Sequence, residues 1–567
     1  MKAFFASFFG VIAAILVVVI VVIVGIASLE SDPPEISSGT TLIIELEGEI
    51  SDQPSASSTI LLDEFLDQPK ALSFSEILLA LDAASRDSRV KDVRIELGVN
   101  DLGYGRIQEM RHAIEQLEAE GKEVSVYAKV YTQKMIYLAR SASQVFIAPG
   151  GYVEFSGLST APFYLKGALD NVGIQAHLVR GSDNIYKSAG EPFIAEEMSD
   201  ANRAQIQERL NAIFNGILGD LSIDGMDTSR LQERMRINPL FRAQDALDYG
   251  FVNALSYGWP DEASLEMDLA DYWEGYEKPS GVKKVAVIVA EGDIQDGSGS
   301  DGVVADETIV KVIHEIAEDK RIGAVVLRVN SPGGSALASD IIWQAVKNLA
   351  EIKPVVVSMG DVAASGGYYI AAPGQEIYAN PASITGSIGV FGLLFTAEEL
   401  FHDKMGIQSQ PVGTHPLALS LTLDQELDPA LLEILQDNVD ITYDRFKEVV
   451  AEGRNLPQAL VDSISRGHVY AGSDAIELGL VDHYGGLIPA IERAEELAGY
   501  RSRAHVVFYP ERPDPLESLV RLARAESQFA AVQSPSNAIP WMLELLNQWS
   551  QLETYQGVQM RELLFKL

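Results

Sequence analysis

The chain has no cysteine, and positive charge is scarce in it. Its 567 residues include 43 Lys and Arg against 81 Asp and Glu, which leaves a formal net charge of −38. The lack of cysteine excludes disulfide bonds and zinc–thiolate sites, although it does not fix the cellular compartment. Nucleic-acid binding needs a basic surface to neutralise phosphates, so we expect no nucleic-acid partner.

Apolar residues are plentiful, at 47% of the chain against 22% charged residues, which is typical of a globular protein. The length is enough for two or three domains.

One uncharged apolar run stands out, from Ala3 to Leu29. It exceeds the ~7–15 residues of a signal-peptide core and reaches the ~20 that cross a bilayer. The alternative is a signal peptide cleaved near Gly25 to Ala27. We expect residues 1–32 to form a transmembrane anchor, with Lys2 in the cytoplasm and the body on the far, periplasmic side in a bacterium.

The rest of the chain contains an internal repeat. Four pairs of segments recur in the same order and at nearly constant spacing: TLIIELEGEI (41–50) with KVAVIVAEGDI (284–294), VRIELGVNDLGYG (93–105) with AVVLRVNSPGGS (324–335), VGIQ (172–175) with MGIQ (405–408), and AQDALDYGFVN (243–253) with GSDAIELGLVD (472–482). The sequence therefore predicts two copies of one domain, at 38–270 and 280–505, followed by a helical tail at 506–567.

Each copy alternates β-branched apolar runs with segments of helical period, a pattern that predicts parallel βαβ units and an α/β fold. In such sheets, sites form where the strands end.

Two glycine-bearing loops follow strands of the second copy, VNSPGGSA (329–336) and MGDVAASGG (359–367). If Ser365 in the latter attacks a carbonyl group, the N–H groups of Gly366 and Gly334 are natural donors to the oxyanion. The alternatives are a helix-capping serine and a phosphate-binding loop, although neither loop ends in the Lys-Ser/Thr of a P-loop.

The base for Ser365 is harder to find, because the histidines form no Ser-His-acid pattern; His415 is the histidine alternative. A lysine can act as base where burial favours its neutral form, and Ser-Lys pairs are known. Lys187 lies among small residues in SDNIYKSAGEPF (182–193) of the first copy. Alignment of the copies places Lys134 within a residue of Ser365 and Leu419 opposite Lys187. We therefore predict a dyad to which the first copy supplies the lysine and the second the serine.

The motifs VNSPGGS, AASGGYYIA, ITGSIGVFG (384–392) and YKSAGEPF resemble the long, duplicated form of the bacterial signal peptide peptidase A (protease IV) family. The resemblance implies tandem crotonase/Clp-protease-like domains and a Ser-Lys endopeptidase with no cofactor and no metal. It also implies a homotetramer on the periplasmic face of the inner membrane that degrades cleaved signal peptides and other extended apolar peptides.

The resemblance implies a role for each matched residue. Ser365 becomes the nucleophile and Lys187 the general base, while Gly334 and Gly366 form the oxyanion hole. Ser387 of TGSIG orients the lysine, with a helix-capping serine as its alternative. Two other classes stay open: a crotonase-type acyl-CoA enzyme, which has no use for an anchor or a split Ser/Lys pair, and an inactive membrane scaffold.

Overall fold

The computed structural model describes residues 33–53, 72–261, 263, 265–279, 283–299, 302–415, 417–418 and 422–511, together with the backbone of 557–561. The predicted anchor, residues 1–32, lies outside them. Among the residues that are described, no helix is both long and apolar enough to cross a bilayer.

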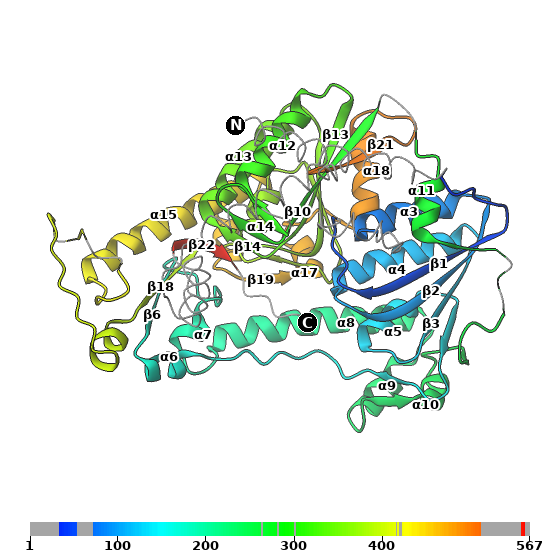
Figure 1. Cartoon of the computed structure of the whole chain (residues 1–567), viewed down its shortest axis with the longest axis horizontal. Helices are drawn as coiled ribbons and strands as arrows, with labels where there is room; N and C mark the ends of the chain where they lie inside the picture. Colours follow the sequence, from blue (N-terminus) through cyan, green and yellow to red (C-terminus); the bar gives the residue numbers. More distant parts are fainter. Residues whose placement is uncertain are drawn as a thin grey trace, which may run out of the picture.

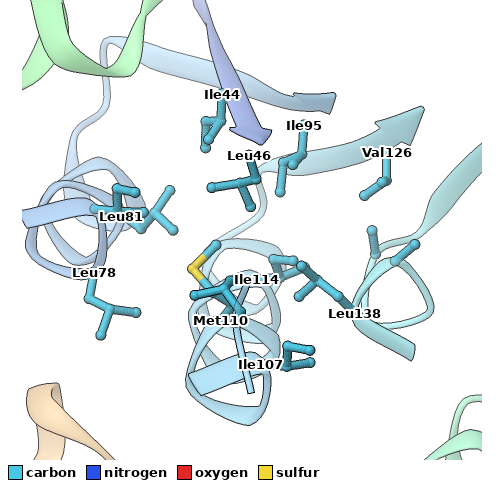
Figure 2. Packing of buried hydrophobic residues seen from close by; sticks show 14 of the residues in the cluster. Ile44, Leu46, Leu78, Leu81, Ile95, Ile107, Met110, Ile114, Val126 and Leu138 are labelled. Atoms are coloured by element: carbon cyan, nitrogen blue, oxygen red, sulfur yellow. The ribbon is translucent and has the colours of Figure 1, made fainter. Parts of the chain in front are cut away.

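The first repeat is built on a parallel six-stranded sheet with the order β8-β4-β3-β2-β1-β9. Figure 2 shows Ile44 and Leu46 of β1, Ile95 and Val126 meeting Met110 and other apolar side chains of the neighbouring helices, so one face of the sheet is covered by them. The bounds are β1 (Thr40–Gly48), β2 (Val90–Asn100), β3 (Glu123–Ala128), β4 (Gln144–Ile147), β8 (Ala254–Leu255), β9 (Glu266–Asp268), α3 (Phe74–Arg86), α4 (Tyr104–Ala119) and α5 (Gln133–Ala139).

The second repeat has an eight-stranded sheet in which β10, β13 and β15 pair in parallel. The predicted alternation of strands and helices is present here, and the β-branched runs form strands that are buried on both faces. The bounds are β10 (Lys284–Glu291), β13 (Ile322–Ser331), β15 (Val355–Ala364), β16 (Glu376–Ala379), β17 (Ile384–Gly386), β19 (Val469–Ala471), β20 (His483–Tyr484), β21 (His505–Tyr509), α12 (Asp306–Glu318), α13 (Ala336–Ala350), α14 (Gly366–Ala371), α17 (Gly472–Glu477) and α18 (Leu487–Leu497).

Residues 156–199 of the first repeat, here called the arm, reach across to the second repeat. Strand β6 of the arm pairs antiparallel with β18 of the second repeat, in a sheet of order β12-β11-β14-β22-β18-β6. Figure 1 shows the long helix α8 leading from the arm back to the first repeat. The bounds are α6 (Lys166–Val172), β6 (Gln175–Arg180), α7 (Glu191–Ile194), α8 (Asp200–Ile223), β11 (Asp293–Gln295), β12 (Val303–Ala305), β14 (Gly333–Ser335), β18 (Phe391–Thr396) and β22 (Gly557–Arg561).

The remaining elements complete the two repeats. Strands β5 and β7 form a small antiparallel pair in the first repeat. The bounds are β5 (Tyr152–Glu154), β7 (Leu240–Arg242), α9 (Thr228–Met235), α10 (Ala243–Asp248), α11 (Leu269–Gly275), the π-helical turn η1 (Leu400–Lys404), α15 (Pro429–Gly453) and α16 (Gln458–Ile464).

A buried ionic cluster also joins the repeats. Arg328 of β13 exposes no side-chain surface, and its Nη2 lies 2.9 Å from Asp52 Oδ1 and 2.8 Å from Glu109 Oε1, both in the first repeat. Burial raises the pKa of the Glu109 carboxyl group, and the Arg328 charge opposes that rise. Because an unpaired buried charge is costly, this cluster couples the two halves of the chain.

The second repeat extends beyond its predicted end, and the few described residues of the predicted helical tail include strands. Strand β21 extends to Tyr509 and pairs in parallel with β10, so the repeat continues beyond residue 505. The segment HVVFY is β-branched and aromatic, and it adds to the edge that β10 offers. In the tail, residues 557–561 form a strand, and 512–556 lie outside the described residues.

Candidate active site

Ser365 occupies the turn between β15 and α14. Its backbone has φ of 56° and ψ of −119°, a conformation that side-chain-bearing residues rarely adopt. The Ser365 N–H group donates to Gly386 O at 2.8 Å, and the Tyr369 N–H group donates to Ser365 O at 2.9 Å. Backbone strain of about 1–3 kcal/mol persists only where surrounding contacts hold it, and it gathers at functional sites. The turn therefore holds the Ser365 side chain in one place at the end of a buried strand.

Lys187 of the arm lies against this serine. Its Nζ is 2.9 Å from Ser365 Oγ, within hydrogen-bonding range, and both residues belong to the same chain. Both side chains have 0% exposure to solvent. Burial disfavours the charged ammonium form of a lysine, which is the direction that a base requires. The arrangement can therefore move a proton between the serine hydroxyl and the amine.

Ser387 supplies two further contacts to the same amine. Lys187 Nζ donates to Ser387 Oγ at 2.7 Å and to Ser387 O at 3.0 Å. Ser387 follows β17 with a φ of 51°, and its own N–H group donates to His468 O at 2.7 Å. Three oxygen contacts thus fix the direction in which the amine points. The structure brings Ser387 to the position at which it can orient the lysine.

The backbone at Gly467 packs directly against Lys187. The Gly467 N–H group donates to Ile388 O at 2.9 Å, and the Tyr186 N–H group donates to Arg466 O at 3.1 Å. Gly467 has φ of +76°, and a Cβ atom there would lie 2.6 Å from both the Cβ and the N of Lys187. Carbon atoms in contact are normally ~3.5–4.0 Å apart, so only glycine allows the lysine backbone to sit this close.

The two glycines assigned to the oxyanion hole lie in loops that touch. A Cβ atom on Gly366 would lie 2.5 Å from Ser339 Oγ and 3.2 Å from the Cα of Gly333, the neighbour of Gly334. Gly334 has a φ of +158°, and a Cβ atom there would lie 2.0 Å from Ile294 O. Both loops are therefore packed too tightly for side chains, and they meet beside Ser365.

An extended segment of the chain's own C-terminus lies along the same loop. Strand β22 runs antiparallel to β14, with Gly334 opposite Met560, and antiparallel to β18, with Phe391 opposite Gln559. Figure 1 shows β22 in red between β14 and β18. Peptides often bind by adding a strand to an exposed sheet edge. Strand β22 thus shows that an extended backbone can pair with β14 and β18 at the same time.

The first repeat holds a different residue at the place of Ser365 than the alignment predicted. Thr132 begins α5 as Ser365 begins α14, and its hydroxyl caps that helix by accepting from the Met135 N–H group. Lys134 lies two positions further on, inside the helix, with its Nζ 5.6 Å from the ring centre of Tyr104. The sequence alignment was therefore shifted, because it matched apolar residues and not the helix start.

The counterpart of Ser387 has also changed in the first repeat. The Phe155 N–H group donates to Pro239 O at 2.9 Å, which repeats the bond from the Ser387 N–H group to His468 O. Phe155 is a buried apolar side chain within the first hydrophobic core. The first repeat thus retains the backbone of the site but has no hydroxyl at this second position.

The structure gives no support to the other candidate residues. His415 is exposed, in the segment between η1 and α15. Leu419, the residue aligned with Lys187, lies outside the described residues. In the part of the chain that the structure describes, no three His, Cys, Asp or Glu side chains gather as a metal site would require.

Sequence analysis missed Gly467 and the placement of β22. Gly467 had a weak signal, because the aligned segments GHVYAGSDA and NPLFRAQDA place it opposite Asn238. A glycine that replaces a larger residue in only one copy indicates a close contact in that copy. The tail strand had no comparable signal, since it has no counterpart in the first repeat.

Comparison with known proteins agrees with the duplication. A model of peptidase family S49 matches this chain twice, over residues 116–269 and 347–501, one range in each repeat. Protease 4 of Haemophilus influenzae is 33% identical over 464 residues, which are 76% of this chain and 74% of that protein. Protease 4 of Salmonella typhi is 31% identical over 508 residues, or 84% of this chain and 81% of that protein.

A plant relative and a solved structure were also found. Serine protease SPPA, chloroplastic, of Arabidopsis thaliana is 30% identical over 487 residues, which are 82% of this chain and 70% of that protein. A ClpP1 mutant from Listeria monocytogenes covers 36% of this chain and 93% of its own, at 15% identity and a TM-score of 0.25. A TM-score that low does not show a shared fold.

Proposed function

Since the chain belongs to peptidase family S49 and is a serine protease, we propose that it is a membrane-anchored endopeptidase with a Ser365–Lys187 dyad. Its proposed substrates are cleaved signal peptides and other extended apolar peptides. The observation that carries the proposal is the distance of 2.9 Å between Lys187 Nζ and Ser365 Oγ in a fully buried setting. Covalent acyl transfer typically uses a nucleophile within hydrogen-bond reach of a base, and a third group that orients the base.

In this mechanism, Ser365 Oγ attacks the peptide carbonyl carbon while neutral Lys187 takes the hydroxyl proton. The oxyanion that forms is stabilised by the N–H groups of Gly334 and Gly366. Collapse breaks the C–N bond, leaves an acyl ester on Ser365, and passes the lysine proton to the departing amine. Water then attacks the ester while Lys187 takes its proton, and the second collapse frees the acid and returns the proton to Ser365.

Ser387 has an orienting role in this proposal. Its Oγ and O both accept hydrogen bonds from Lys187 Nζ, which leaves the amine little freedom to turn away from Ser365. The bond from the Ser387 N–H group to His468 O holds Ser387 itself in place. This support favours an orienting role for Ser387 over a helix-capping one.

The substrate backbone is proposed to bind as a strand between β14 and β18. The position of β22, antiparallel to both, supports this mode because it places an extended backbone beside Gly334. Binding through the backbone accepts many sequences, with side-chain pockets adding selectivity. A peptide would have to be extended to enter, which suits unfolded apolar segments and excludes folded proteins.

Anchoring and assembly complete the proposal. The uncharged run from Ala3 to Leu29 supports a single membrane span, with the protease domains on the periplasmic side of a bacterial inner membrane. The arm exposes Phe163 by 86%, and a large apolar side chain so exposed supports contact between copies in a homotetramer. We also infer that both repeats have the crotonase/Clp-protease type of fold. A chain starting at residue 33 is expected to leave the membrane fraction and stay active.

The dyad is tested with a fluorogenic apolar peptide and a fluorophosphonate probe for the serine. Ser365→Ala and Lys187→Ala are each expected to abolish peptide cleavage, and Ser365→Ala to abolish labelling. The matched controls are Thr132→Ala, which removes the corresponding hydroxyl of the first repeat, and Lys166→Ala, an exposed lysine of the arm. Both controls should keep most activity. Normal turnover by Lys187→Ala would overturn the assignment of the base, and a wild-type protein inert on peptides would overturn the whole proposal.

A further inference from the structure

We propose that Gln205 is a positioning residue that sets how Lys187 and Ser387 meet. Gln205 lies on α8 of the first repeat, outside the motifs that the sequence analysis singled out, and its side chain is 1% exposed. The inference rests on the proposed Ser365–Lys187 dyad. It assigns Gln205 no contact with a substrate, only with the two backbone segments that carry the lysine and its orienting serine.

The donor side of the Gln205 amide holds the lysine segment. Its Nε2 donates to Tyr186 O at 2.8 Å and lies 3.3 Å from Ser188 Oγ. Tyr186 and Ser188 are the two neighbours of Lys187 in the chain. The contact therefore acts on the backbone from which the lysine side chain extends.

The acceptor side of the same amide holds the second repeat. Gln205 Oε1 accepts a hydrogen bond from the Val469 N–H group at 3.3 Å, at the start of β19. The preceding residue is His468, whose carbonyl oxygen accepts from the Ser387 N–H group at 2.7 Å. One side chain thus connects the backbone next to Lys187 with the backbone that fixes Ser387.

The chemistry of the site requires an amide in one orientation. Tyr186 O can only accept a hydrogen bond, and the Val469 N–H group can only donate one, so the NH₂ and the oxygen of Gln205 have fixed places. Asn202 Oδ1 also accepts from Nε2, at 3.2 Å. An apolar side chain would leave buried backbone groups unpaired, and a carboxylate would place an oxygen against Tyr186 O.

Gln205 lies where the two repeats meet, and the two residues of the proposed dyad come from different repeats, Lys187 from the first and Ser365 from the second. The arm and the second repeat are different parts of the chain, so the distance of 2.9 Å between Lys187 Nζ and Ser365 Oγ depends on contacts between them. The buried Arg328 cluster joins the repeats elsewhere, and Gln205 is next to the lysine itself. Loss of the amide is therefore expected to loosen the lysine while the fold persists.

The test compares Gln205→Met, which keeps the length of the side chain but removes both polar groups, with Gln207→Met. Gln207 is exposed on the same helix, with its amide bonded to Asn211, and serves as the matched control. Both proteins are made as the full chain, and kcat and KM on a fluorogenic peptide are measured together with the thermal midpoint and the assembly size. Gln205→Glu is measured as a second variant, because it keeps the acceptor for Val469.

We expect both Gln205 variants to be folded and to lose at least about 10-fold in kcat with KM within twofold, since small misplacements of catalytic groups cost this much. Gln207→Met should match the wild type. The inference is overturned if kcat is unchanged, or if activity falls only in proportion to the folded fraction. Lys187→Ala separates this from the dyad: if that variant stays active, the proposed function fails whatever Gln205 does.

Discussion

Replacing Gly467 with alanine tests how closely the lysine must be held. The new Cβ atom would lie 2.6 Å from the Cβ and N of Lys187 and 2.8 Å from its Cα. Ordinary carbon contacts are ~3.5–4.0 Å, so one of the two backbones has to move by about 1 Å. The Lys187 Nζ–Ser365 Oγ separation is 2.9 Å, and an added 1 Å takes it beyond hydrogen-bonding range.

The expected effect is on kcat. A displacement of about 1 Å at a catalytic group can lower the rate by about 100-fold, which corresponds to ~2.7 kcal/mol in the activation free energy. KM should change little, because the peptide is proposed to bind between β14 and β18, and Gly467 belongs to neither strand. The measurement is steady-state hydrolysis of an extended apolar peptide, with a thermal melt of each protein.

The control is Gly499→Ala. Gly499 has φ of +68°, close to that of Gly467, but nothing lies within 4 Å of its added Cβ atom. Both variants share the ~1–2 kcal/mol cost of alanine in the left-handed region. Only Gly467→Ala should lose kcat. Equal kcat values for the two variants would refute the reasoning that the close contact between Gly467 and Lys187 fixes the position of the lysine.

Three further predictions concern pH, the buried cluster and the tail. Lys187 must be neutral to accept a proton, so kcat should be low in acid and rise towards mildly alkaline pH; a flat profile from about pH 5 to 9 would count against it. Arg328→Met leaves two buried carboxyl groups without their cation and should lower the free energy of unfolding in denaturant by about 3–5 kcal/mol. The control, Arg321→Met at an exposed ion pair, should change it by less than ~1 kcal/mol, and equal losses would contradict the role of the cluster. A chain ending at Glu511 lacks β22 and should have a lower KM for peptides, because a tethered strand competes at an effective concentration of about millimolar; an unchanged KM would mean that β22 and substrates do not bind in the same place.

The second repeat illustrates what sequence patterns can predict. Its buried parallel strands were predictable because continuous β-branched apolar runs, such as the one at the start of β15, are typical of strands covered on both faces. Lys187 and Ser365 were paired by comparing the two copies, and the structure places them in contact. The comparison misplaced Lys134, because apolar matches do not define where a helix begins. The N-cap position of Thr132 needed the backbone itself.

Other parts of the site depend on contacts that local sequence does not encode. Gln205 is one of two glutamines on α8, and only the contact between the two repeats puts it next to both Tyr186 and Val469. The strand at residues 557–561 has no repeat partner, and its pairing with β14 and β18 is set by the edges that those strands leave open. Long-range pairing of this kind follows from the assembled sheet and not from periodicity.

The division of the dyad between the repeats has a consequence for the newly made chain. Lys187 and Ser365 are 178 positions apart, so the lysine leaves the ribosome well before the serine. At about 5–20 residues per second, the interval is roughly 10 to 35 s. During that time the nascent chain contains the proposed base but not the proposed nucleophile, and at the position corresponding to Ser365 the first repeat has Thr132, whose hydroxyl caps a helix. On the proposed mechanism, peptide-bond cleavage begins only after the second repeat has been made and has folded against the arm, which protects the growing polypeptide from its own activity.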